Sequence, residues 1–190
     1  MKIEVCNLET ERLLLRKLNI GDLDNYIEFR GNEKLHTFLS TKPKDKVNDY
    51  KKSLRSIIKA YNSKTPRLIW AIVLKDEKKL VGTISIENYL VAHKSCELGW
   101  SVNVNYQGKR IATEAGHALI NHVFGNYDIN RIHASIWKGN EASERLALKL
   151  GFSHEGTERQ ARFKNGEFLD VLNFGLLRSE WESLNKNTKM

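Results

Sequence analysis

Seven short segments of the chain have the apolar pattern of β-strands, in which apolar residues alternate with polar ones or run together for a few positions. They cover residues 10–18, 68–75, 80–88, 96–102, 131–137, 153–163 and 167–177. Asn165 and Gly166 separate the last two segments, and this dipeptide is the strongest short signal for a hairpin turn. The pattern therefore predicts a sheet that ends in a β-hairpin.

Four further segments have apolar residues three and four positions apart, which is the spacing of one face of a helix. They cover residues 21–31, 45–61, 110–125 and 140–150. We expect Asp22 and Asn140 to cap the first and the last of these helices, and Gly125 and Gly151 to end the third and the fourth. From Glu182 to Met190 we expect a frayed tail.

This order of elements is typical of an α+β fold, in which helices cover a largely antiparallel sheet. The chain has 190 residues, a length that suits one domain with a substantial apolar core. We therefore expect a single domain over residues 1–190, with its core between residues 9 and 181.

The composition excludes some classes of protein and favours an anionic ligand. Hydrophobic residues make up 41% and charged residues 28% of the chain, as in globular proteins and unlike disordered or membrane proteins. The formal net charge of +8 favours contact with something anionic, such as a phosphate-rich cofactor or an acidic protein. The basic residues are scattered and no zinc-finger or ribonucleoprotein pattern occurs, so nucleic acid is not expected as the main ligand.

Cysteine and histidine usage argues against disulfide and metal sites. Cys6 and Cys96 are too few for a disulfide framework or a cysteine-based zinc site, and His117, His122 and His133 lack ligand partners at metal-binding spacing. Charges interrupt every apolar run near the N-terminus, so neither a signal peptide nor a spanning helix is predicted there. We expect a cytoplasmic protein without a metal site.

Residues 102–115 have the pattern of an anion-binding loop. A predicted strand ends at Val102, a short loop contains Gly108, and a predicted helix follows at once. Unpaired N–H groups at a helix N-terminus attract phosphates, and Lys109 and Arg110 add positive charge there. An ordinary turn also accounts for one such glycine, and the P-loop and dinucleotide-binding patterns are absent.

Several motifs in order resemble the GCN5-related N-acetyltransferases (GNAT), and within them the ribosomal-protein N-terminal acetyltransferases (RimJ/RimL-like). The motifs are TERLLLR at 10–16, ELGW at 97–100, YQGKRIATEA at 106–115, NEAS at 140–143 and LGF at 150–152. The resemblance covers nearly the whole chain. It implies a central mixed, mostly antiparallel seven-stranded sheet flanked by about four helices. It also implies that the sheet splays between the fourth and fifth strands, so that acetyl-CoA enters the gap.

The resemblance also assigns residues to coenzyme A. The loop residues are Val102, Gln107, Gly108, Lys109, Arg110, Ile111, Ala112 and Thr113, and Asn140 would contact the pantetheine arm as well as cap its helix. Arg110 stands where the family usually has glycine. Glycine there permits unusual dihedral angles, so Arg110 implies backbone strain or a guanidinium that clamps a phosphate oxygen.

Acetyl transfer to an amine requires a neutral nitrogen and a proton for the departing thiolate. Glu97 matches the position of a catalytic glutamate in a relative and is our leading base, placed among apolar neighbours. The alternative is a carboxylate satisfied by its surroundings. Ser143 matches a serine proposed as proton donor, with simple capping as its alternative. Cys96 is expected to be buried rather than acetylated, and Glu114 to complement the helix dipole.

The resemblance therefore predicts direct transfer of acetyl from acetyl-CoA to a primary amine in a ternary complex, by a monomer or homodimer. One acceptor is the N-terminal α-amine of a ribosomal or other protein, and the alternative is a small amine such as a polyamine or aminoglycoside. A non-enzymatic alternative is an acyl-CoA-binding sensor. Residues 30–67, which would shape the acceptor side, contain no diagnostic motif.

Overall fold

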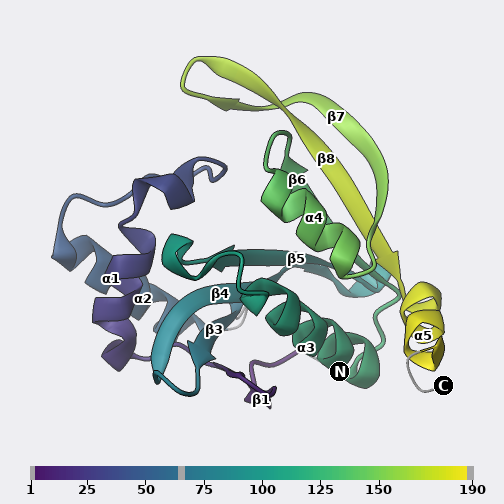
Figure 1. Ribbon diagram of the computed structural model, residues 1–190, viewed down its shortest axis with the longest axis horizontal. Coiled ribbons are helices and arrows are strands. Elements are labelled where there is room, and N and C mark those ends of the chain that lie inside the picture. Colours follow the sequence, from purple (N-terminus) through teal and green to yellow (C-terminus); the bar gives the residue numbers. More distant parts are fainter. Residues whose placement is uncertain (1–2, 64–66, 188–190) are drawn as a thin grey trace. The chain divides into compact units, whose positions relative to one another are not determined.

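A computed structural model of the chain describes residues 3–63 and 67–187. Within them it is an α+β fold with eight strands and five α-helices (Figure 1). Hydrogen bonds link the strands in the order β1-β2-β3-β4-β5-β6-β8-β7. The pairings are antiparallel for β1–β2, β2–β3, β3–β4, β6–β8 and β7–β8, and parallel for β5–β6. The predicted mixed, mostly antiparallel sheet is confirmed, with one strand and one helix more than expected.

The chain packs as two compact units. The described part of the N-terminal unit contains residues 3–63, 67–87 and 99–121, and that of the C-terminal unit contains residues 88–98 and 122–187. Strands β4 (Lys79–Leu90) and β5 (Ser95–Val102) and helix α3 (Ile111–Asn126) each contribute residues to both units.

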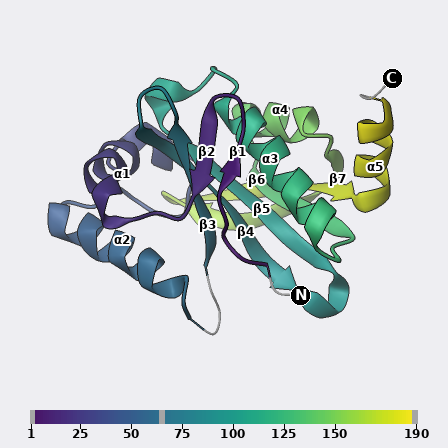
Figure 2. The same cartoon turned by 90° about the horizontal axis from the view of Figure 1, so that it is seen from below.

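The N-terminal unit contains four neighbouring strands (Figure 2). The edge strand β1 (Leu8–Glu9) pairs with β2 (Leu13–Arg16), β2 pairs with β3 (Leu68–Leu74), and β3 pairs with β4. Helices α1 (Leu23–Arg30) and α2 (Val47–Ala60) pack on one another. Their apolar residues join β3 and β4 residues in one buried cluster, which consists of Leu18, Tyr26, Tyr50, Leu54, Ile57, Ala71, Val73 and Leu80. Burial of each large side chain of this kind contributes about 1.5–3 kcal/mol.

Asp22 occupies the N-cap position of α1, as expected, but its side chain makes no capping hydrogen bond to that helix. Asn19 caps the 3-10 helix Ile20–Asp22 that precedes α1, and its side chain accepts a hydrogen bond from the N–H of Gly21. The Asp22 carboxylate instead accepts from the N–H of Asn19 and from the Arg16 guanidinium. A partly buried arginine is a stronger partner for that carboxylate than backbone N–H groups alone.

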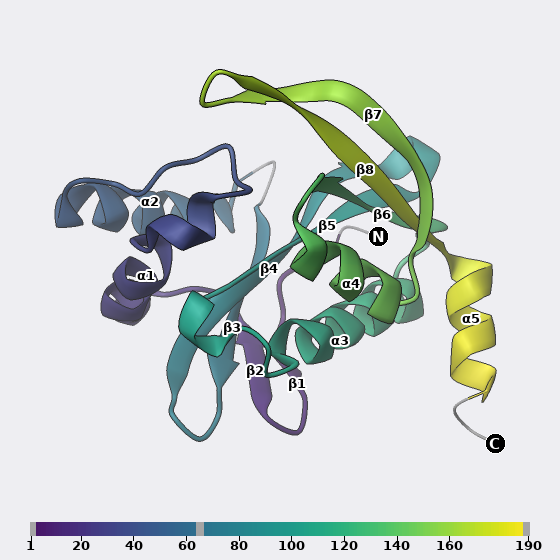
Figure 3. The same ribbon diagram turned by 45° about the horizontal axis from the view of Figure 1, so that its top comes forward.

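In the C-terminal unit, β6 (Arg131–Trp137) pairs with β8 (Glu167–Leu177), which pairs with the edge strand β7 (Ser153–Lys164). The predicted hairpin turn between β7 and β8 is confirmed (Figure 3). Both of its central residues have positive φ, 51° at Asn165 and 88° at Gly166, as a type I′ turn requires. Helix α4 (Glu141–Lys149) contacts β6 and β7.

Two helix ends differ from the predictions. Helix α3 continues through Gly125 to Asn126, so Gly125 does not end it. A helix not predicted from the sequence, α5 (Arg178–Asn187), occupies most of the stretch expected to fray. The Arg178 guanidinium donates to the carbonyls of Phe124, Tyr127 and Ile129, and the Trp181 ring packs 5.4 Å from that of Phe124. These long-range contacts anchor α5, and sequence periodicity does not report them.

The parallel ladder between β5 and β6 is short. It runs from the pair Ser95–Arg131 to the pair Glu97–His133. Both strands continue beyond it, to Val102 and to Trp137. The ladder therefore ends where the resemblance places the opening of the sheet.

Candidate active site

The chain leaves β5 in a turn organised by Asn103, which is 1% exposed. Its backbone N–H donates to the carbonyl of Val81, and its side-chain oxygen accepts from the N–H of Asn105 at 3.1 Å. Its amide nitrogen donates to Glu28 at 2.9 Å. Because a buried polar side chain with all these bonds has one position, the start of the loop is fixed. No local pattern in the sequence singles out this residue.

The predicted coenzyme-binding loop has a strained backbone. Gly108 has φ of 77° and Arg110 has φ of 60°, both in the left-handed region. A side chain there costs about 1–2 kcal/mol, which glycine avoids. The strain expected at Arg110 is therefore present. Within the loop, the side-chain amide of Gln107 donates to the carbonyl of Val102 at 3.1 Å and so spans the turn.

The loop and the first turn of α3 offer backbone donors. Within the described part of the chain, the N–H groups from Gly108 to Thr113 donate to no other group. Ile111 is buried and anchors the helix start, whereas Lys109 and Arg110 are exposed. Unpaired donors at a helix N-terminus, with the positive end of the helix dipole, suit a diphosphate.

An aromatic ring supports the lysine of the loop. The Lys109 ammonium lies 4.9 Å from the ring centre of Tyr106, and the Lys79 ammonium lies 5.4 Å from it. The Tyr106 hydroxyl donates to Glu77 at 2.6 Å, and Lys79 forms an ion pair with Glu28 at 2.9 Å. The loop therefore carries positive charge whose position is limited by cation–π contacts.

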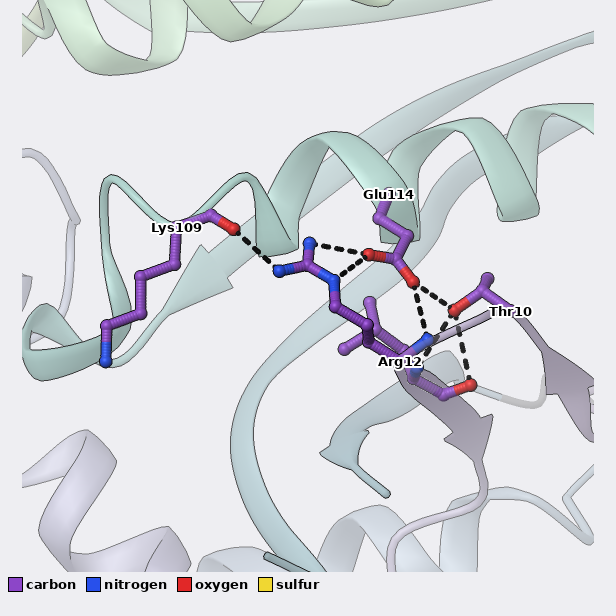
Figure 4. Close-up of polar contacts among 5 residues, drawn as sticks. Thr10, Arg12, Lys109 and Glu114 are labelled. Carbon is purple, nitrogen blue, oxygen red and sulfur yellow. Dashed lines mark hydrogen bonds and ion pairs between the residues drawn. The ribbon is translucent and has the colours of Figure 1, made fainter. Parts of the chain in front are cut away.

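Glu114, in the first turn of α3, ties that helix to the segment before β2 (Figure 4). Its carboxylate accepts from the Thr10 hydroxyl, from the Arg12 N–H at 3.0 Å and from the Arg12 Nε at 2.7 Å. Arg12 also donates to the carbonyl of Lys109 at 3.2 Å. Burial alone raises the pKa of Glu114, but the bonds from Thr10 and Arg12 outweigh it and hold the pKa below its ordinary value. We call these residues the Glu114 clamp.

In the C-terminal unit, Glu97 lies on β5 with 19% of its side chain exposed. Its Oε2 accepts from the Asn88 amide at 2.6 Å and lies 3.9 Å from the His133 Nε2. The expectation of apolar neighbours is therefore wrong, because the adjacent strands β4 and β6 place polar residues on either side of it. Neither Asn88 nor His133 was singled out from the sequence as a partner of Glu97.

Cys96 points to the opposite face of β5 and is fully buried. Burial raises the pKa of its thiol to about 12. A thiol with that pKa supplies almost no thiolate near neutral pH, and only the thiolate is a good nucleophile. Cys96 is thus a core residue, as expected.

Asn140 caps α4 as predicted. Its side-chain oxygen accepts from the Ser143 N–H at 3.2 Å. The cap uses Oδ1 and leaves the Nδ2 donor outside that bond. Ser143 lies in the first turn of the helix and is half-buried. The structure therefore accounts for the capping role of Asn140.

In residues 3–63 and 67–187, no cluster of three or more His, Cys, Asp or Glu side chains is arranged to hold a metal ion. None of the helices described is both long enough and apolar enough to cross a membrane.

Comparisons with known proteins identify the family. Residues 12–153 match the model of the acetyltransferase (GNAT) domain. The uncharacterised N-acetyltransferase YoaA of Bacillus subtilis is 26% identical over 171 residues, 90% of this chain and 96% of the relative. The ribosomal protein uS5-alanine N-acetyltransferase of Escherichia coli is 25% identical over 179 residues, 92% of each chain. A solved GCN5-related N-acetyltransferase from Brucella melitensis superimposes with a TM-score of 0.86 at 25% identity, covering 98% of this chain and 85% of that one.

The family match spans most of the chain and contains the β5–α3 loop, Arg12 and Glu114 of the clamp, and the cap of α4. It agrees with the motifs found in the sequence and with the fold. This chain is an N-acetyltransferase and belongs to the GNAT family of acetyltransferases.

Proposed function

We propose that this enzyme transfers the acetyl group of acetyl-CoA to the α-amine at the N-terminus of a protein, with ribosomal proteins as the first acceptors to test. One observation carries the proposal. The N–H groups from Gly108 to Thr113 have no partner within the described residues, and they lie at the start of a helix beside two exposed cations. Backbone donors of this kind bind the diphosphate of coenzyme A.

The residues of the chain then have distinct tasks. The loop binds the diphosphate, and the Glu114 clamp holds the loop and α3 in place. The Nδ2 group of Asn140 is a donor for the amides of the pantetheine arm. Glu97 accepts a proton from the acceptor amine, so that the neutral nitrogen attacks the thioester carbonyl carbon. A carbon–nitrogen bond forms, the carbon–sulfur bond breaks, and the nitrogen releases its second proton to solvent. Ser143 gives a proton to the departing sulfur and regains one from solvent.

Charge and acidity support an α-amine as acceptor. An α-amine has an ordinary pKa of about 7.7–8.0, against about 10.4 for a lysine side chain, so it needs less help from a base at neutral pH. The net charge of +8 opposes the approach of a polyamine more than that of an acidic protein. The relative named for the alanine of ribosomal protein uS5 agrees with this choice.

Calorimetry with two acetyl donors tests the coenzyme site. Acetyl-CoA is expected to bind, whereas S-acetylpantetheine, which lacks the diphosphate, is expected to bind at least about 100-fold more weakly, since charge-assisted contacts to a diphosphate contribute several kcal/mol. Equal affinity for the two donors, or no heat with acetyl-CoA, would refute the role of the loop.

Thiol release tests the acceptor. Peptides that begin with alanine or serine from ribosomal proteins are compared with the same peptides blocked at the N-terminus, with polyamines and with aminoglycosides. We expect release only with free N-termini. Release with small amines alone would replace the proposed acceptor, and an enzyme that binds acetyl-CoA yet acts on no amine would be a sensor.

A further inference from the structure

Polar side chains form a row across the strands of the C-terminal unit where the β5–β6 ladder ends. Asn88 lies on β4, Glu97 on β5 and His133 on β6, and Glu97 and His133 are direct partners in the parallel ladder. The next residue across the sheet is Gly175 on β8, which is the partner of His133. A side chain at Gly175 would collide with Glu155 and Arg131, whose ion pair covers that position.

The two oxygens of Glu97 differ within this row. Oε2 accepts the Asn88 amide at 2.6 Å and faces the His133 ring at 3.9 Å. Oε1 accepts no hydrogen bond from the described residues, and 19% of the Glu97 side chain is exposed. One oxygen is therefore fixed by protein groups and the other is open to a ligand.

Charged groups lie on both sides of His133. Glu97 lies on one side, and on the other lies Glu155, whose pKa Arg131 holds below its ordinary value with a smaller effect from His133 in the same direction. Two carboxylates and one guanidinium thus lie around this part of the row.

We propose that His133 and Asn88 are positioning residues for acetyl transfer: Asn88 holds Oε2 of Glu97 by a hydrogen bond and His133 lies beside the same oxygen, so that Oε1 faces the acceptor amine and takes its proton. This inference rests on the proposed function and adds the residues that prepare its base. Asn88 suits the task because φ of 45° at this position is tolerated by asparagine better than by most side chains.

The experiment measures kcat and KM for His133→Gln, which keeps a polar side chain at this position but removes the ring. We expect kcat to fall about tenfold near neutral pH while KM for the peptide stays within about twofold. Affinity for acetyl-CoA and the melting temperature should stay as in the wild type. The matched control is His93→Gln, at an exposed histidine of the same unit, which should change nothing.

A second variant keeps the test informative if His133→Gln is poorly folded. Asn88→Asp retains tolerance of positive φ but replaces the donor to Oε2 by a second carboxylate, so kcat should again fall while KM for the peptide stays within about twofold. The double variant Glu97→Gln with His133→Gln should be no slower than Glu97→Gln alone, because the two residues act as a unit.

The outcomes separate the two levels of the proposal. If the wild type releases thiol with peptides but His133→Gln leaves kcat unchanged, the positioning role is wrong and the proposed function stands. The positioning role is also wrong, and the proposed function also stands, if the double variant loses kcat by the product of the losses in Glu97→Gln and His133→Gln. If the wild type shows no release with any amine, the proposed function fails first.

Discussion

The β5–α3 loop and the Glu97 row are built in opposite ways. The loop presents backbone N–H groups in a strained turn, and its side chains mainly hold that turn in shape. The Glu97 row presents side chains, and ordinary β-strands hold them in register. In the proposed function the loop binds a diphosphate, a ligand of constant shape that main-chain donors suit. In the same proposal the Glu97 row moves a proton, and this task depends on which side chains meet there.

The largest effect on turnover is expected in the Glu97 row. Glu97→Gln removes the proton acceptor but keeps the shape, so kcat should fall about 10²–10⁴-fold while affinity for acetyl-CoA stays within about twofold. Thiol release and calorimetry on the same preparation measure both. Glu182→Gln, at an exposed glutamate of α5, is the control for loss of one carboxylate. A variant that keeps its turnover would show that Glu97 is not the base.

The second effect concerns the clamp that holds the loop. Glu114→Gln removes a partly buried charge that faces Arg12 and Thr10, and should destabilise the fold by about 1–3 kcal/mol and weaken acetyl-CoA binding several-fold. Glu144 occupies the matching position in the first turn of α4, without a comparable partner among the bonds described. Glu144→Gln should therefore lose only the helix-dipole contribution, about 0.3–1 kcal/mol. Equal losses in urea unfolding would mean that the clamp contributes nothing beyond the dipole.

The clamp also makes stability depend on pH. The pKa of Glu114 lies below its ordinary 4.5 in the folded protein, so the ionised carboxylate stabilises the fold above about pH 4.5. That contribution is lost as the pH falls through the lower folded value. The wild type should therefore lose more stability than Glu114→Gln between about pH 5 and pH 3, as measured by urea unfolding at each pH.

The two regions also differ in how well the sequence predicts them. The loop residues are contiguous, so Gly108, Lys109 and Arg110 stand out beside a predicted helix start, and the strain at Arg110 follows from a pattern that expects glycine. The partners of Glu97 come from β4 and β6, and only strand register brings Asn88 and His133 to it. The sheet, its hairpin and the cap at Asn140 depend on local signals and were predicted. Helix α5 depends on Arg178 reaching carbonyls about fifty residues earlier in the chain, which no local pattern reports.

A smaller effect is expected from the backbone of the loop. Gly108→Ala places a methyl group at φ of 77°, where no neighbouring atom lies within 4 Å, so the change adds strain without a clash. It should cost about 1–2 kcal/mol, as lost stability or as weaker acetyl-CoA binding if the loop relaxes. Gly125→Ala, in α3 with equally open space, should instead stabilise by up to about 1 kcal/mol. Thermal melts and calorimetry of Gly108→Ala and Gly125→Ala distinguish the effect of a methyl group at positive φ from the effect of a methyl group alone.

The smallest effect distinguishes the strained backbone of Arg110 from its guanidinium. Arg110→Gly relieves positive φ but loosens the unfolded chain, so stability should change by less than about 0.5 kcal/mol. Lys78→Gly makes the same exchange at φ of 48° in the β3–β4 turn and removes the same charge. If backbone donors bind the diphosphate, Arg110→Gly keeps acetyl-CoA affinity within a few-fold of the wild type and Lys78→Gly leaves it unchanged. Loss of all binding in Arg110→Gly would show that the guanidinium is the main ligand of the phosphate, and the loop would then resemble the Glu97 row in depending on one side chain.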